Sequence, residues 1–345
     1  MTDFSRPYAS KWRLYRIDPR NWSEQDEVGG VISASISRNS GGMLESGSIE
    51  LDSPIGGGFD EGYYRLVLNA TQEGRTERHD ISTLYCSRTS GVVDRRYDRK
   101  TLTGRSVLVP ASGVAMPMGS FLPKGSDAVA YVARILGSSL AAPVVAVGSF
   151  TLADDYVFDI GSKVLDVVWT VLNAGGWTMF VDGSGVVTVA KLPSEPTIDM
   201  PEDMAGVLYP EISYETDLIE VPNRYVAIDD SGNMAYAVND SPNSIVSTVA
   251  RGFIVDADMD TSPTLLGGET LADYCRRKLT EASVVSDVRS YTREYIPNLL
   301  PDMLIRGTLS TVGMTGAMRI DNQSLECGVG VVVSESSKRE VALWT

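Results

Sequence analysis

Residues 31–38 read Val-Ile-Ser-Ala-Ser-Ile-Ser-Arg, and this stretch indicates the fold class. From Ile32 to Ser37, apolar and serine side chains alternate strictly, which is the period of a strand with one buried and one solvated face. Five neighbouring stretches show similar patterns, with glycine-rich or polar turns between them. The first hundred residues therefore predict a β-barrel or β-sandwich. The expected strands are Lys11–Ile17, Val31–Arg38, Ser48–Asp52, Tyr63–Asn69, Thr83–Ser87 and Lys100–Val109.

The middle of the chain changes character, because apolar side chains now recur at helical spacing. Ser126 is expected to cap a helix over Asp127–Leu136, and a second helix is expected over Ser162–Ala174. A turn at Asp182–Gly185 then predicts a hairpin. This combination is typical of a small α+β module. The expected hairpin strands are Trp177–Val181 and Val186–Lys191.

The last part of the chain returns to alternating strands and contains one amphipathic helix, expected over Glu269–Ala282. The predicted fold class is therefore mainly β with an α+β insertion. The expected domains are residues 1–110, 111–200 and 201–345. The expected C-terminal strands are Arg224–Ile228, Met234–Val238, Gly252–Val255, Val288–Ile296, Met303–Leu309, Met318–Asp321, Val329–Ser334 and Glu340–Trp344.

Composition excludes several classes of protein. The 345 residues are 43% hydrophobic and 22% charged, as in a soluble globular chain, and the net charge is -15. Residues 1–105 balance 15 basic against 15 acidic side chains, whereas residues 106–345 carry 15 basic against 30 acidic. A protein that grips DNA needs a basic face, so that class is excluded. No apolar run approaches the roughly 18 residues of a membrane span, and the start lacks a signal-peptide core, so synthesis in the cytoplasm is expected.

The sequence predicts no cofactor and no zinc site. Cys86, Cys275 and Cys327 are far apart, and His79 is the single histidine, so these residues offer no usual zinc spacing. We expect three small buried thiols and a histidine in an ordinary loop.

One acidic stretch matches the start of a calcium loop, with carboxylates at Asp256, Asp258 and Asp260. The remainder of that pattern is missing, because Thr261 stands where a glycine makes the turn and Gly267 where a glutamate should bind. A solvated acidic loop is the favoured interpretation, and a calcium site is the weaker one.

Enzyme signatures are absent from the sequence: there is no H-E-x-x-H, G-x-S-x-G, S-x-x-K or phosphate-binding glycine loop. The chain is therefore expected not to be an enzyme. A carbohydrate-binding or carbohydrate-active β protein stays open as the alternative, because two carboxylates suffice for glycoside hydrolysis and tryptophans stack on sugars. The tryptophans are Trp12, Trp22, Trp169, Trp177 and Trp344, and four of them occupy core-like positions.

One cationic cluster, Arg95–Lys100, contains Tyr97 and Asp98 among its basic residues. On a chain this acidic, a solvated loop or a contact with a negatively charged partner is favoured over nucleic-acid binding.

The order of these elements resembles that of the baseplate hub, or tail-tip hub, proteins of long-tailed bacteriophages. Those hubs are related to the hubs of contractile bacteriocins and of type VI secretion spikes. The resemblance covers most of the chain and is one of fold pattern rather than chemical motif. The stretches that carry it are Val31–Arg38, Gly47–Leu51, Tyr63–Leu66, Asp127–Leu136, Phe158–Asp166, Asn173–Trp177, Phe180–Gly183, Ala272–Ala282, Tyr291–Tyr295 and Leu300–Leu304.

The resemblance implies two tail-tube-like β-barrels, in residues 10–109 and 205–345, and a homotrimer whose six barrels match a sixfold tube. It implies a structural virion component at the tail tip. The implied partners are the distal tail or tail-tube protein, a spike or central fibre protein, the tape-measure protein and DNA in transit. A negative channel lining would let DNA slide without sticking. The candidate lining residues are Asp229, Asp230, Asp256, Asp258 and Asp260.

Overall fold

The computed structural model describes residues 2–28, 30–40, 45–53, 60–93, 98–152, 155–200, 208–229, 231–257, 259–261, 263, 269–309 and 314–344. The chain forms two compact units, the first made of Met1–Ile212 with Ser290–Ser337 and the second of Ser213–Arg289 with Lys338–Thr345. Among the described residues, no helix combines the length and the hydrophobicity that a membrane-spanning segment needs.

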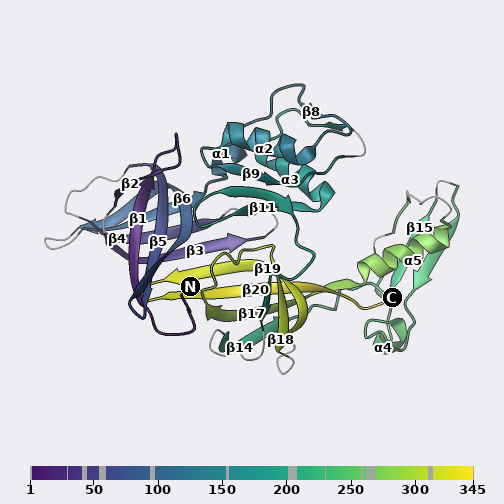
Figure 1. Ribbon diagram of the computed structural model, residues 1–345. Helices are drawn as coiled ribbons and strands as arrows, with labels where there is room; N and C mark the ends of the chain where they lie inside the picture. Colours follow the sequence, from purple (N-terminus) through teal and green to yellow (C-terminus); the bar gives the residue numbers. More distant parts are fainter. Residues whose placement is uncertain are drawn as a thin grey trace. The chain divides into compact units, whose positions relative to one another are not determined.

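Seven N-terminal strands form a curled sheet around a hydrophobic core (Figure 1). β1 pairs with β2 and β5 and also contacts β3, which brings the two sides of the sheet together. The alternation in the sequence has a direct cause, because Ile36 is fully buried in this core while Ser35 and Ser37 are only half-buried on the opposite face. The strands are β1 (Ala9–Ile17), β2 (Glu24–Glu27), β3 (Gly30–Asn39), β4 (Ser46–Ser53), β5 (Gly62–Gln72), β6 (Arg75–Val93) and β7 (Asp98–Ser106).

The C-terminal strands continue this sheet, because β19 pairs antiparallel with β3. The result is a 13-stranded sheet with the order β14-β17-β20-β19-β3-β4-β7-β6-β5-β1-β2, in which β18 pairs with β13 and β19 outside that path. Leu325 and Val333 of these strands join the N-terminal core. The strands are β13 (Ile198–Met200), β14 (Leu208–Glu215), β17 (Val284–Glu294), β18 (Leu304–Leu309), β19 (Met314–Cys327) and β20 (Val331–Ala342).

An α+β module lies within the first unit, between β7 and β13 in the chain. Asp127, rather than the expected Ser126, caps α2, because its carboxylate accepts hydrogen bonds from the backbone N–H groups of Val129 and Ala130. Gly176 ends α3 in the left-handed conformation. The module contains α1 (Val109–Gly113), β8 (Phe121–Leu122), α2 (Ala128–Ser139), β9 (Val144–Val147), β10 (Tyr156–Val157), α3 (Val164–Gly175), β11 (Trp177–Val181) and β12 (Val187–Lys191).

The second unit is built on a hairpin and a helix. The β15–β16 hairpin packs on α5 through Ala227, Tyr274 and Cys275, and a separate small cluster forms around Val246. Thr270 and Asp273 make a reciprocal capping box at the start of α5. The elements are β15 (Arg224–Ile228), β16 (Met234–Val238), α4 (Thr248–Arg251) and α5 (Leu271–Ala282).

The predicted fold class, mainly β with an α+β insertion, is confirmed. The expected strand Gly252–Val255 is wrong, because Gly252 adopts a positive φ of 72° as the cap of α4 and loop residues follow. The last two expected strands form one strand, β20, and Val109 starts α1 instead of ending β7. Both expected N-terminal domains fall within the first unit, and the three-domain division stays a prediction.

Candidate functional site

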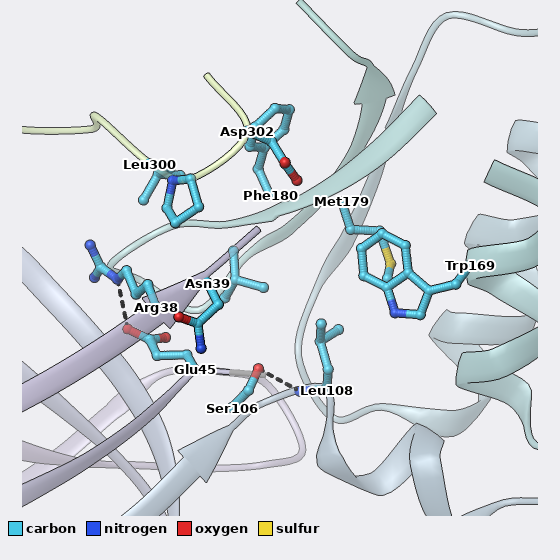
Figure 2. Close-up of a pocket in the computed structure, with 12 residues that line it drawn as sticks. Arg38, Asn39, Glu45, Ser106, Leu108, Trp169, Met179, Phe180, Leu300 and Asp302 are labelled. Carbon is cyan, nitrogen blue, oxygen red and sulfur yellow. Dashed lines mark hydrogen bonds and ion pairs between the residues drawn. The ribbon is translucent and has the colours of Figure 1, made fainter. Parts of the chain in front are cut away.

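A small cavity lies where the curled sheet meets the α+β module (Figure 2). Its volume is about 50 Å³, which is room for a few water molecules and too little for a sugar ring. Trp169 projects toward it from α3, and Leu108, after β7, lies between Trp169 and Ser106 (Figure 2). Its lining residues are Arg38, Asn39, Glu45, Ser106, Leu108, Trp169, Met179, Phe180, Val181, Leu300, Pro301 and Asp302.

A buried ion pair forms the polar side of this cavity. Arg38 Nε donates to Glu45 Oε1 at 2.8 Å, and Arg38 Nη2 donates to the carbonyl of Ile81. Burial alone lowers the pKa of Arg38, but the charge and hydrogen bond of Glu45 outweigh it, and the net direction is upward. These bonds tie Glu45, just before β4, to β3 and β6.

The structure describes three of the five candidate channel residues. Asp229 closes the turn of the β15–β16 hairpin by accepting from the backbone of Ser231 and Asn233. Asp256 forms an ion pair with Arg224, with Nε–Oδ1 at 2.5 Å. Asp260 accepts a hydrogen bond from the hydroxyl of Tyr274. Asp230 and Asp258 lie outside the described residues.

Two residues of the expected acidic loop lie beside β15. Asp256 and Asp260 form parallel bridges with Arg224 and Ala227, respectively. No group of three potential metal-binding side chains occurs in the part of the chain that the structure describes. The calcium interpretation stays a prediction, because Asp258 is outside that part.

The cationic cluster, the cysteines and two of the tryptophans have the following surroundings. Of the cationic cluster, residues 95–97 lie outside the described residues, while Asp98 is buried beside Lys100 at 3.4 Å. All three cysteines are free and buried, as expected. Trp12 and Trp22 donate their indole N–H groups to backbone carbonyls of Gly328 and Ser184. These hydrogen bonds hold both indole rings against the backbone of distant parts of the chain.

His79 does not lie in a loop, as the sequence suggested, but in β6. Its ring packs edge-on against Phe4 and Tyr295, with centroid distances of 5.0 and 6.4 Å. Burial lowers its pKa, although Glu77 Oε2, 3.9 Å from Nε2, acts in the opposite direction. The N-terminal segment thus covers a neutral histidine.

This arrangement predicts a pH dependence of stability. A folded-state pKa below the unfolded value of about 6.5 means that the unfolded chain binds more protons, so stability falls as pH drops from about 7 through the folded pKa. The melting temperature should therefore be lower at pH 5.5 than at pH 7. Because His79 is the single histidine, His79→Gln should flatten this dependence. An equally steep profile in that variant would contradict the assignment.

Sequence reasoning missed a group of hydrogen bonds that joins the tip of the β11–β12 hairpin to the curled sheet. The carbonyl of Gly183 accepts from Thr83 Oγ1 at 2.9 Å, and the carbonyl of Ser184 accepts from Arg65 Nη2 at 2.7 Å and from Trp22 Nε1 at 2.9 Å. The Asp-Gly-Ser-Gly turn predicted the hairpin correctly, but nothing in it indicated what its tip would touch.

Sequence reasoning also missed a buried polar network between β17, β19 and β20. Glu335 accepts from Arg293 Nη2 at 2.5 Å, from Gln323 Nε2 at 2.7 Å and from the hydroxyl of Tyr291. Arg293 and Glu335 are 1% and 3% exposed. Burial, followed by the charge of Glu335, raises the pKa of Tyr291 well above its ordinary value, so its hydroxyl stays a donor. Tyr291 also shares a hydrogen bond with Ser337 at 2.8 Å.

The sequence matches no known protein-family model and no curated protein. The fold, in contrast, is similar to solved structures along nearly its whole length. A tail protein from Neisseria meningitidis MC58 aligns with a TM-score of 0.63 at 10% identity, covering 96% of this chain and 97% of that one. The 43 kDa tail protein of prophage MuSo2 from Shewanella oneidensis aligns with a TM-score of 0.60 at 10% identity, covering 95% and 97%.

A third similar structure is an E. coli component of the type VI secretion system, described as structurally similar to the T4 bacteriophage tail proteins gp27 and gp5. It aligns with a TM-score of 0.52 at 10% identity, covering 89% of this chain and 73% of that one. This chain therefore has the fold of phage tail proteins and of the related secretion component. The resemblance read from the sequence is confirmed at the level of fold.

Proposed function

We propose that this protein is a structural, non-enzymatic hub at the tip or baseplate of a phage tail. The observation that supports the proposal is the length of the structural alignments with two tail proteins, which cover about 95% or more of this chain and of each tail protein. The likeness therefore includes the sheet, the inserted module and the second unit together. In this role the chain acts as a homotrimer. It joins a sixfold tail tube to a threefold spike or fibre.

The symmetry argument rests on the two sets of strands in each chain. Three chains supply six strand sets, enough to match a sixfold tube on one side, while the trimer itself offers threefold symmetry on the other. The partners are the distal tail or tail-tube protein, the spike or central fibre protein and the tape-measure protein. The hub is made in the host cytoplasm and ends in the virion, where it takes part in tail assembly and genome ejection.

The hub also surrounds the path of DNA. An acidic surplus in residues 106–345 repels phosphates and prevents DNA from sticking during passage. We assign part of this lining to the acidic candidates of the second unit. These are Asp229, Asp230, Asp256, Asp258 and Asp260.

The purified chain, co-expressed with its tail-tube or spike partner, should form threefold rings. Electron microscopy of end-on views should show an axial hole, and the particle mass, after subtraction of the bound partner, should equal three times the chain mass of 37.3 kDa. The chain expressed alone serves as the control for assembly that depends on the partner. Single-chain particles that persist with both partners present would contradict the proposal.

A further inference from the structure

One face of the large sheet is covered by small hydroxyl side chains. On β3, β4, β7 and β19, the residues that alternate with buried Ile36, Ile49, Leu102 and Leu325 point away from the core. We call these outward side chains the hydroxyl face. They are Ser33, Ser35, Ser37, Ser46, Ser48, Glu50, Asp52, Arg99, Thr101, Thr103, Arg105, Asn322, Ser324 and Glu326.

Strand register aligns these side chains in rows across the sheet. Ser35 pairs with Glu326 on one side and with Ser48 on the other, and Ser48 in turn pairs with Thr103. With strands about 4.8 Å apart, each four-strand row extends about 14 Å. A neighbouring row contains Ser324, Ser37, Ser46 and Arg105.

The charged side chains of this face have a slight negative excess, because two arginines stand against three carboxylates and Arg99 lies 3.9 Å from Glu50. Two serines donate to carboxylates within the face, Ser35 Oγ to Glu326 at 2.8 Å and Ser33 Oγ to Glu50 at 3.1 Å. These bonds orient the acids along the surface. A shallow depression lined by Ser35, Ser48 and their neighbours shows that the face is open to solvent.

The composition of the face fits neither a protein contact nor a DNA-gripping surface. Protein interfaces rely on aromatic and large apolar anchors, and the hydroxyl face has none. DNA-binding surfaces neutralise phosphates with Lys and Arg, whereas this face offers Arg99 and Arg105 against Glu50, Asp52 and Glu326. Small neutral hydroxyls with a slight negative excess suit a wall along which a polyanion moves without being held.

We propose that the hydroxyl face is the part of the first unit that lines the DNA channel, which rests on the tail-hub function proposed above. The ligand is double-stranded DNA in transit, and the face contributes by not binding it.

The test adds cations to the face. Ser35→Lys, Ser48→Lys and Thr103→Lys together should slow DNA release from assembled particles on the order of tenfold at low salt, and added salt should restore it, because each new phosphate contact is salt-dependent. The matched control is Ser112→Lys, Ser138→Lys and Thr170→Lys, at exposed positions of the module's helices. It should release DNA at the wild-type rate. Equal rates in both triple variants, with normal assembly, would overturn the inference and leave the hub function intact.

A second measurement does not depend on the lysine variant assembling. Ser48→Cys gives a single reactive thiol, since the three native cysteines are buried. In assembled, DNA-free tails it should react with a small maleimide but not with one coupled to a bulky polymer. Reaction with both would place the face outside, and reaction with neither would make it a subunit contact; each overturns the inference. Absence of the wild-type chain from tails would instead remove the hub function, and the inference with it.

Discussion

Replacing Glu335 by alanine should lower the free energy of unfolding by about 3 to 5 kcal/mol, the largest effect expected in this protein. The substitution leaves Arg293, which is 1% exposed, as an uncompensated charge in the core. It also removes one of the hydrogen-bond partners of Gln323 and of Tyr291. Urea unfolding followed by tryptophan fluorescence should show the midpoint shift.

The control separates charge from volume. Arg293→Met combined with Glu335→Leu removes both charges and keeps apolar bulk, so it should recover most of the stability that Glu335→Ala loses. If Glu335→Ala unfolds like the wild type, the network is not closed to water as described. If the double variant is as unstable as the single one, the loss comes from packing.

This network shows where sequence reasoning stops. Alternation along β17 predicts that Tyr291, Arg293 and Tyr295 share a face, but a face that carries an arginine is typical of a solvated one. The partner Glu335 is 42 residues away, in a stretch where alternation predicts the strand and not the pairing. Strand positions follow from local side-chain period, whereas the neighbours of each strand depend on register across the whole sheet.

The candidate site shows the same division. Sequence reasoning placed Asp229 in a hairpin turn, where it lies, and Asp256 in a solvated acidic loop, whereas Asp256 forms a parallel bridge with Arg224. It did not find the Arg224 partner of Asp256 or the Tyr274 partner of Asp260, because both contacts join distant parts of the chain. The serine alternation was visible from the start, but its significance appeared only when register aligned the serines of several strands in rows.

The second large effect is expected at the tip of the β11–β12 hairpin. A Cβ built on Gly183 would lie closer than 3.0 Å to the backbone of Asp80 in β6, and backbone cannot yield as a flexible side chain can. Gly183→Ala must therefore lift the tip away from the sheet. That movement breaks the bonds from Thr83 and Arg65 to the tip, and Arg65 is 8% exposed.

Gly183→Ala should lower the free energy of unfolding by about 3 kcal/mol, because it overpacks the contact and leaves buried donors without acceptors. Hydrogen exchange should rise at the tip and in the facing part of β6, because the two are held by the same bonds. The matched control is Gly137→Ala in α2, where an added Cβ meets no atom within 4 Å. There the same substitution should stabilise the protein by about 0.5 to 1 kcal/mol, since alanine favours helix. If Gly183→Ala lowers the free energy of unfolding and Gly137→Ala raises it, the destabilisation comes from the lost contact between the hairpin tip and the sheet. Equal small changes in both variants would show that the hairpin tip does not hold the module to the sheet.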